Sequence, residues 1–504
     1  MAVVISTTIS EHQEVVVRPH QYHRTVSCTG RPILFQLNIE TSLYKNLDYF
    51  DSNFLARLNH IACTTSPKED ISAKWREIHG SGDWVNLLNP LHPALRQEIV
   101  KYGEFAQATY DAFDFDPFSE YCGSCRYNHR NIFDRLGLSK NGYKVTKYLY
   151  AMSHINMPSW LKRSHLVDTW SKDSNWMGYV AVSNDEESHR IGRRDIVVAW
   201  RGTVTPSEWY KDLQDELEPI GDGDVQVEHG FYSIYTSKSE STRYNKSSAS
   251  DQVMKEVIRL VSLYIQEGEK LSLTITGHSL GGALALLNAY EAAASLPDLP
   301  ISVITFGGPR VGNVAFREKL HRMGVKTLRV VVKQDIVPKM PGFVFHDAVE
   351  QLYMITGKLE WFYTHVGVEL QLDVESSPHL KRGGFNFSGF HSLETYLHLV
   401  DGFLSTNLKF RSDARRDVAL VNRDCGMLLN ELRIPEFWYQ LTRMILFDLR
   451  DIKDATSGNS LIASYVQYDE IEEDDPDYRM VSWGIHSFEL ASNGEYKDDL
   501  RMFP

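Results

Sequence analysis

The sequence predicts an α/β protein with a mainly parallel central sheet. Between Tyr179 and Leu372, short runs rich in Val and Ile alternate with longer segments whose apolar residues recur at helical spacing. Strands covered by helices on both faces read as continuous apolar runs, so this alternation is typical of a parallel sheet. The expected strands are YVAVS, DIVVAW, LSLTIT, ISVITF, TLRVVVK and VGVELQL, and the expected helices are VMKEVIRLVSLYI and LGGALALLNAYEAA.

The 504 residues allow one large domain with appendages. Residues 1–73 show no sustained period and are expected to be a leader and linker. The expected α/β domain covers residues 74–433 and begins with a helical N-terminal extension, in which a long helix runs from Leu95 to Phe113. The segment after Phe403 is expected to be helical or mixed. Residues 434–504 form a C-terminal extension without an assigned role, and their acidic run DEIEEDDPD is typical of a solvated loop.

The composition of the chain narrows the kinds of partner and compartment that we expect for it. The formal charge of −13 gives no basic footprint for nucleic acid, and it favours neutral over anionic lipid surfaces. The sequence contains no run of roughly 20 apolar residues, so membrane contact is expected to be peripheral. Five cysteines are too few for a secreted disulfide scaffold and fit a reducing or plastid-like compartment. The first residues fit either an organellar transit segment or a leader without a targeting signal.

A serine stands at an expected strand-to-helix junction. Gly277-His278-Ser279-Leu280-Gly281 joins the strand LSLTIT to the helix LGGALALL. A nucleophilic serine in such a turn occupies a strained position that nearby glycines permit. The Leu280 amide, at the start of the helix, can then donate to a developing oxyanion. The alternative is a glycine-rich βα turn whose serine takes no part in catalysis.

A nucleophilic serine needs a histidine to accept its proton and an acid to orient that histidine. In sheets of this kind the chain order is Ser, then Asp or Glu, then His. Asp335 follows the buried strand LRVVV and is expected at the carboxyl edge of the sheet, where the acid belongs. By position alone, His391 is favoured only slightly over His365 and His379 as the base.

Acyl transfer also needs a hydrogen-bond donor from a second strand. The strand DIVVAW ends at Trp200 and is followed by Arg201, Gly202 and Thr203. Both the amide and the hydroxyl of Thr203 can point at the carbonyl oxygen. An ordinary cap or turn residue would show the same pattern.

A short acidic segment carries a single apolar stripe. Trp209, Leu213 and Leu217 recur every four residues and are expected on one face of a helix. The stripe fits a mobile lid over an acyl pocket and equally an ordinary surface helix. If it is a lid, serine at Trp209 and Leu213 will change activity on a soluble ester and on micelles by different factors. An equal change on both substrates would argue against gating.

Several motifs occur together in one order: WRGT, TGHSLGGALALLNAYE, ITFGGPRVGN, DIVPKMP, YTHVGVEL and FHSLETYLHLVDGF. From Lys74 to Arg433 the chain resembles the plant class 3 lipases, in particular the plastid phospholipase A1 and galactolipase group. The resemblance implies an α/β-hydrolase fold, hydrolysis of the sn-1 acyl ester of phospholipids or galactolipids, and no metal or organic cofactor. It also implies a chloroplast location, with the cytoplasm as the alternative.

Carried over by position, the resemblance assigns the nucleophile to Ser279, the acid to Asp335 and the base to His391, which it raises above its rivals. It makes Thr203 and Leu280 the oxyanion donors. The usual His-Asp-Leu at the base reads His-Ser-Leu at 391–393. The competing interpretations are an esterase for triacylglycerol or other esters, and a lipase-like signalling scaffold with little hydrolysis.

A CxxC pair raises the question of metal chemistry. Cys122 and Cys125 stand close to His129, but the chain offers no second pair. Structural zinc sites use four ligands, so three soft ligands predict a loop with two thiols and no metal.

Overall fold

The computed structural model describes residues 69–114, 122–152, 174–203, 216–221, 223–341, 363–383, 386–406 and 408–438, and three short strands beyond them. By its contacts the chain divides into two compact units. The larger comprises Cys63–Leu446 and Tyr468–Trp483, and the smaller comprises Met1–Ala62, Phe447–Gln467 and Gly484–Pro504. In the smaller unit, β10 (Ala463–Ser464), β11 (Ser487–Leu490) and β12 (Tyr496–Asp498) pair in that order, antiparallel.

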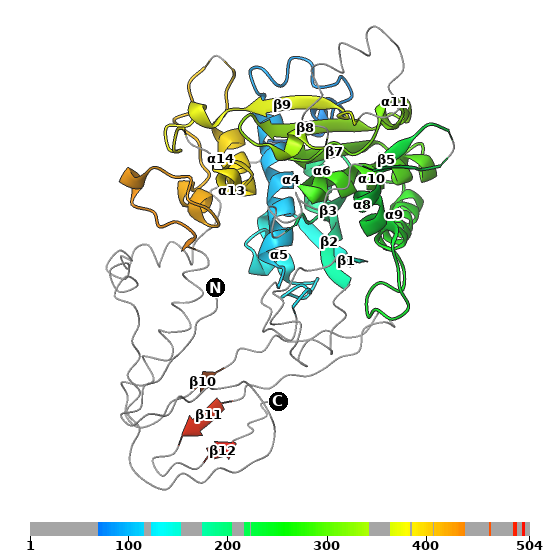
Figure 1. The fold of residues 1–504 in the computed structure, drawn as a ribbon. Coiled ribbons are helices and arrows are strands. Elements are labelled where there is room, and N and C mark those ends of the chain that lie inside the picture. The colour runs from blue at the N-terminus through cyan, green and yellow to red at the C-terminus, as the bar shows by residue number, and fades with distance from the viewer. Residues whose placement is uncertain are drawn as a thin grey trace. The chain divides into compact units, whose positions relative to one another are not determined.

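The larger unit is built on a seven-stranded sheet in the order β1-β2-β3-β6-β7-β8-β9 (Figure 1). β3, β6, β7, β8 and β9 are parallel to one another, and β1 and β2 add an antiparallel edge. The predicted α/β-hydrolase fold with a mainly parallel sheet is therefore confirmed. The strands are β1 (Tyr143–Met152), β2 (Ser174–Ser183), β3 (Arg194–Trp200), β6 (Leu271–His278), β7 (Ile301–Phe306), β8 (Lys326–Val332) and β9 (Val368–Leu372).

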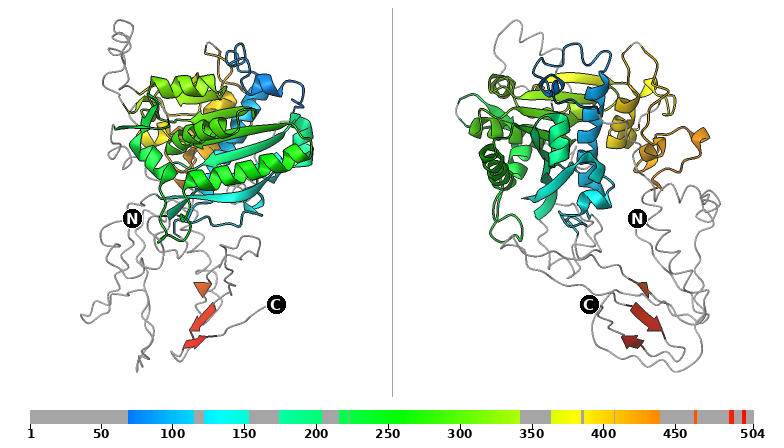
Figure 2. Two further views of the ribbon diagram at one scale, coloured as in Figure 1. Left: turned by 90° about the vertical axis from the view of Figure 1, so that its right-hand side faces the viewer. Right: turned by 180° about the vertical axis from the view of Figure 1, so that it is seen from behind.

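Helices cover both faces of this sheet, which Figure 1 and the right-hand view of Figure 2 show from opposite sides. One face carries α8 (His229–Thr236), α9 (Ala249–Gln266) and α10 (Leu280–Ser295), which share one apolar core with the sheet. The other face carries α4 (Pro93–Asp111) and α14 (Leu393–Gly402), which share the second core. The shorter elements are α3 (Trp75–Ile78), α5 (Ile132–Arg135), α6 (Asp185–Ile191), α11 (Val314–Arg322), α13 (Phe387–Phe390), β4 (Leu217–Pro219) and β5 (Gln226–Glu228).

The two longest helices of the described residues begin where their sequences carry start signals. Pro93 is the first residue of α4, where its missing N–H costs nothing, and the His92 ring accepts from the Ala94 amide at 3.2 Å. α9 opens with a capping box between Ser248 and Asp251. The helix expected from Leu95 to Phe113 is thus confirmed as α4.

The segment after α14 is expected to be helical or mixed, and its described residues have the mixed structure. Residues 408–438 contain turns and two short 3₁₀ helices, Val418–Asn422 and Asn430–Leu432. Long side chains draw the segment across the helices instead: Arg416 contacts Glu104 on α4 at 3.0 Å and Glu394 on α14 at 2.6 Å. These tertiary ion pairs replace the local contacts that a helix would use.

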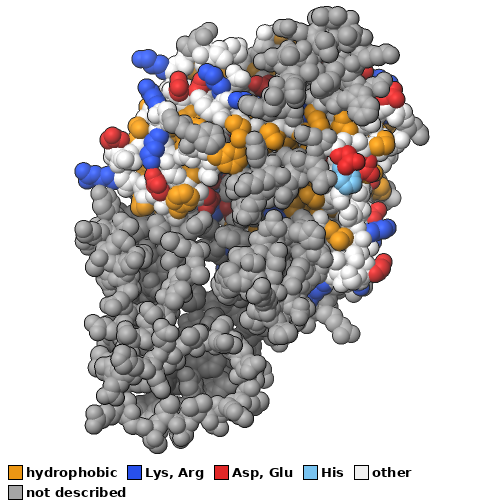
Figure 3. Space-filling model, viewed as in Figure 1, with side chains coloured by type: hydrophobic (Ala, Val, Ile, Leu, Met, Phe, Trp, Pro, Cys, Tyr) orange, Lys and Arg blue, Asp and Glu red, His pale blue; other side chains and the backbone are white. Residues whose placement is uncertain are grey.

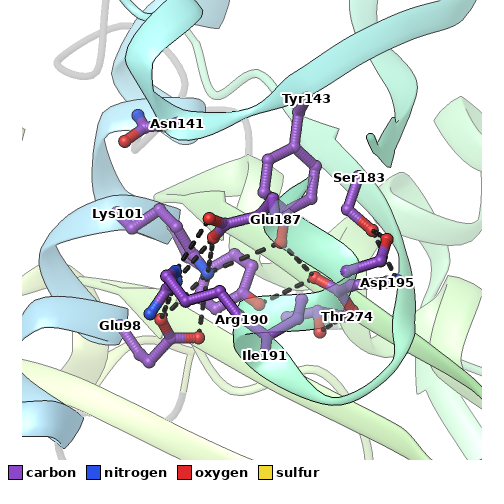
Figure 4. Close-up of polar contacts among 12 residues, drawn as sticks. Glu98, Lys101, Asn141, Tyr143, Ser183, Glu187, Arg190, Ile191, Asp195 and Thr274 are labelled. Atoms are coloured by element: carbon purple, nitrogen blue, oxygen red, sulfur yellow. Dashed lines mark hydrogen bonds and ion pairs between the residues drawn. The ribbon is translucent and has the colours of Figure 1, made fainter. Parts of the chain in front are cut away.

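α4 is fixed to the sheet by a buried cluster of charged and hydroxyl side chains (Figure 4). On α4, Lys101 bonds both oxygens of Glu98 at 2.9 Å, and its Nζ lies 3.7 Å from Glu187 on α6. Arg190 donates one hydrogen bond to each carboxylate oxygen of Glu187, at 2.8 and 2.6 Å. Burial alone would raise the pKa of Glu98, but Lys101 and His79 hold it well below its usual value. Glu98 is therefore ionised and paired at neutral pH.

Asp195, the second residue of β3, accepts four hydroxyl hydrogen bonds. Ser272 and Thr274 donate to Oδ1, and the phenols of Tyr102 and Tyr143 donate to Oδ2, at 2.7 to 2.9 Å. Burial raises the pKa of this carboxyl, but nearby Arg193, His79 and Lys101 lower it by more, so that it lies below the usual value. Asp195 thus joins α4, β1, β3 and β6.

We predict that Asp195→Asn destabilises the fold by about 3 to 5 kcal/mol, because it leaves buried cations without their counter-charge. Urea unfolding at pH 7 measures the loss. Because the folded pKa lies below the unfolded value of about 3.9, the stabilisation is present at neutral pH and fades as pH falls below that value. The difference between wild type and variant should therefore shrink in acid.

Asp413→Asn is the matched control, since Asp413 pairs with Arg411 at the surface. Its urea midpoint should match that of the wild type. Equal midpoints for the two variants would show that the cluster does not stabilise the fold.

Candidate active site

Ser279 lies on the bend between β6 and α10. Its backbone has φ 58° and ψ −128°, a conformation that residues other than glycine rarely adopt. A Cβ added at Gly277 would collide with the Gly281 carbonyl, and one added at Gly281 would collide with the Trp200 carbonyl. Glycines two residues to either side of Ser279 therefore let strand, helix and the neighbouring β3 approach one another.

The bend is tied to the sheet and leaves the serine hydroxyl unused. The Ser279 amide donates to the Phe306 carbonyl at the end of β7, at 3.0 Å. Within the described part of the chain, the buried Oγ of Ser279 has no hydrogen-bond partner. Leu280 is the first residue of α10, so its amide belongs to the turn whose N–H groups lack acceptors within the helix.

His391 and Asp335 are brought together from two loops. Asp335 lies three residues beyond β8, and His391 lies between α13 and α14. His391 Nδ1 and Asp335 Oδ2 are 2.7 Å apart, and both side chains are almost completely buried. Because the carboxylate accepts, Nδ1 donates, and the neutral ring then presents Nε2 as an acceptor. In the described structure Nε2 is buried without a hydrogen-bond partner.

Two further donors fix the Asp335 carboxylate. The Tyr396 hydroxyl on α14 donates to Oδ2 at 2.6 Å, and the Val337 amide donates to Oδ1 at 3.0 Å. Burial and the charge of Asp335 raise the pKa of Tyr396 well above its usual value, so it remains a donor. Tyr396 lies within the motif FHSLETYLHLVDGF, but its role could not be predicted from the sequence.

The end of β3 approaches Ser279 at Gly202. A Cβ at Gly202 would lie 3.1 Å from Ser279 Cβ and would collide with the Tyr110 hydroxyl. Thr203 follows, and its hydroxyl is buried without a hydrogen-bond partner among the described residues. Thr203 and Leu280, the two residues predicted to donate to an oxyanion, thus lie on the two segments that border Ser279.

Arg201 fixes the end of β3 through hydrogen bonds and a ring contact. Its guanidinium donates to the Trp176 and Gly202 carbonyls at 2.9 Å each and lies 3.7 Å from the centre of the Phe113 ring. Burial lowers the pKa of Arg201 to about 10, and Arg201 stays charged at neutral pH. The Gly202 carbonyl is thereby held toward Arg201.

The other candidates from the sequence have different positions. The His379 ring packs on His398 and Phe410. Leu217 is the first residue of β4 and pairs with Glu228 of β5, so the expected helix does not extend to it. Strand pairing overrides the four-residue period there. Trp209 and Leu213 lie outside the described residues.

Cys125 is a partly buried thiol that donates to the Tyr148 hydroxyl at 3.3 Å. Burial raises the pKa of Cys125 to about 12, the opposite of what a reactive thiolate requires. In the described segments, no group of three or more His, Cys, Asp and Glu side chains is arranged to hold a metal ion.

Comparison with known proteins identifies the family of this chain. The model of the family "Lipase (class 3)" matches residues 197–345. The chain is 45% identical over 435 residues to phospholipase A1-Igamma1, chloroplastic, of Arabidopsis thaliana, an alignment that covers 82% of each chain. This chain belongs to the class 3 lipases. It is therefore a carboxylic ester hydrolase that acts on lipids.

Other proteins match as well. The chain is 38% identical over 418 residues to phospholipase A(1) DAD1, chloroplastic, of Arabidopsis thaliana, covering 78% of this chain and 89% of that protein. Among solved structures, the lipase from Rhizopus microsporus var. chinensis is 21% identical, with 62% of this chain and 85% of that chain covered and a TM-score of 0.36.

No helix in the described ranges is both long and apolar enough to span a bilayer.

Proposed function

We propose that this class 3 lipase hydrolyses the sn-1 acyl ester of membrane glycerolipids, phospholipids or galactolipids, and releases a free fatty acid. Ser279 is the proposed nucleophile, His391 the base and Asp335 the acid that orients it. The amides of Thr203 and Leu280 are the proposed oxyanion donors. The relatives named phospholipase A1 support the substrate class and the position of the ester.

One observation supports these roles most strongly. Asp335 binds only one of the two ring nitrogens of His391, at 2.7 Å, and the other ring nitrogen has no hydrogen-bond partner in the described structure. A base in a serine hydrolase needs this asymmetry, because one nitrogen fixes the tautomer while the other accepts the serine proton. The proposed nucleophile, Ser279, likewise keeps its hydroxyl uncommitted.

The proposed reaction has two steps. Ser279 Oγ attacks the acyl carbonyl while its proton passes to His391 Nε2, and the oxyanion forms next to the Thr203 and Leu280 amides. The ester C–O bond then breaks, and His391 returns the proton to the lysolipid oxygen. In the second step His391 removes a proton from water, which attacks the acyl-enzyme. The fatty acid leaves, and the Ser279 hydroxyl is restored.

Glycerolipids reside in membranes, so we propose peripheral contact with a lipid surface. The face in Figure 3 shows groups of hydrophobic side chains between acidic and basic ones in the described region. The formal charge of −13 opposes binding to anionic lipid. Neutral galactolipid or phosphatidylcholine surfaces fit this charge better.

A chloroplast location is also part of the proposal, and the chloroplastic relatives support it over the cytoplasmic alternative. We expect a fluorescent fusion of residues 1–70 to accumulate in chloroplasts of leaf cells. Fluorescence that stays in the cytosol would contradict the targeting role of this segment.

We predict that Ser279→Ala abolishes labelling by a fluorophosphonate probe and lowers kcat by about 10⁴-fold or more, because no acyl-enzyme can form. Fatty-acid release from phosphatidylcholine with different acyl chains at sn-1 and sn-2 measures both the rate and the position. Monogalactosyldiacylglycerol, triolein and a nitrophenyl ester are compared in parallel.

Ser262→Ala, on the exposed side of α9, is the matched control and should keep wild-type rates. Release of mainly the sn-2 acid would refute the regiochemistry. Faster turnover of triolein than of either membrane lipid would refute the substrate class. Undiminished labelling of Ser279→Ala would refute the proposed nucleophile.

A further inference from the structure

The residue just before the proposed nucleophile, His278, uses both of its ring nitrogens. Nδ1 lies 2.7 Å from the hydroxyl of Tyr110 on α4, and Nε2 lies 2.8 Å from the backbone carbonyl of His391. The ring is buried. The motif that contains Ser279 assigns no role to this histidine.

The two partners leave a neutral His278 one protonation pattern. A carbonyl oxygen only accepts, so Nε2 must carry the proton. In a neutral ring Nδ1 is then the acceptor, and the Tyr110 hydroxyl must donate to it. Burial and the neighbouring His391 lower the pKa of His278 well below its usual value, which keeps the ring neutral.

The carbonyl that His278 binds belongs to the proposed base. The centres of the two imidazole rings are 4.6 Å apart. Asp335 holds the ring of His391, and His278 holds its backbone. Because His278 and Ser279 are consecutive, the second bond connects the turn of the nucleophile directly to the turn of the base.

Tyr110 is well placed to control the hydrogen bond between His278 and the His391 carbonyl. It lies in the last turn of α4, and a Cβ at Gly202 would collide with its hydroxyl, so it also borders the end of β3. Glu98 and Lys101, earlier on the same helix, belong to the buried charged cluster. At 1.5 Å per residue, the cluster anchors α4 about 14 to 18 Å from Tyr110 along the helix.

We propose that His278 is a positioning residue that sets the distance between His391 and Ser279, and that Tyr110 fixes the tautomer in which His278 can do so. The proposal rests on the proposed roles of Ser279 and His391. A buried histidine that only fills the core would affect stability alone. One that positions the base also affects kcat in protein that is fully folded.

Two substitutions at His278 separate its two hydrogen bonds. In His278→Gln the amide nitrogen stands near the position of Nε2 and can still donate to the His391 carbonyl. In His278→Asn the amide reaches only the position of Nδ1, facing Tyr110, and the bond to His391 is lost. The full-length chain is assayed with a soluble nitrophenyl ester, and the folded fraction of each variant is measured by near-UV circular dichroism.

We expect His278→Asn to lower kcat by about 100-fold with KM changed less than about twofold, because a small displacement of a base has effects of this size. His278→Gln should retain kcat within about fivefold of the wild type. Equal kcat values per folded molecule for the Asn and Gln variants would overturn the proposal. So would a His278→Asn variant as active as the wild type.

Tyr110→Phe provides an independent test that does not alter His278. It should lower kcat by roughly 3- to 10-fold, because the ring can then adopt the other tautomer and turn a lone pair toward the carbonyl. Tyr179→Phe is the matched control, since the Tyr179 hydroxyl is also buried and donates to the Phe105 carbonyl at 2.9 Å. If His278→Asn does not fold, equal kcat values for the two phenylalanine variants overturn the proposal.

The same assay distinguishes failure of the positioning role from failure of the proposed function. If the nucleophile is wrong, Ser279→Ala keeps activity. If only the positioning role is wrong, Ser279→Ala is inactive, Tyr110→Phe matches Tyr179→Phe, and His278→Asn and His278→Gln have equal kcat values.

Discussion

The structure depends on the close approach of backbone segments around one bend. Ser279 keeps a strained backbone conformation because β6, α10 and the end of β3 meet at Gly277, Gly281 and Gly202, where no side chain could fit. The strain is maintained by the sheet, since the Ser279 amide is bonded to β7. A hydroxyl raised in this way keeps its hydrogen-bonding capacity for a substrate carbonyl.

The bend alone does not make a site, because the groups that surround Ser279 come from both faces of the sheet. α10 continues from the bend on one face and contributes the Leu280 amide. From the opposite face, α4 contributes Tyr110 and α14 contributes Tyr396, which hold His278 and Asp335 respectively. The buried cluster around Glu98 and Asp195 then has a consequence beyond stability, because it fixes the helix that presents Tyr110.

The local parts of this arrangement could be predicted from the sequence. The glycine spacing around Ser279 reflects a contact between near neighbours, and parallel strands bury both faces, so their apolar runs are easy to recognise. The antiparallel edge strand β1 was not predicted, because the polar residues Lys144, Thr146 and Lys147 interrupt its apolar residues. The apolar stripe that ends at Leu217 wrongly predicted a helix there. Periodicity describes a segment in isolation, whereas pairing with β5 makes Leu217 part of a strand.

The distant parts could not be predicted in the same way. Tyr110 and His278 are 168 residues apart, and Asp335 and Tyr396 are 61 apart, so no spacing rule connects them. Chain order narrowed the choice of acid and base without deciding between His391, His365 and His379. Only the family resemblance favoured His391 clearly, and the bond to Asp335 now supports that choice.

A crystal structure of the enzyme after reaction with an alkyl fluorophosphonate tests the central claim most directly. We expect phosphorus bonded to Ser279 Oγ, its double-bonded oxygen facing the Thr203 and Leu280 amides, and His391 Nε2 within about 3 Å of the alkoxy oxygen. Phosphorus on another residue, or a Ser279 adduct from which the His391 ring is turned away, would contradict the proposed site.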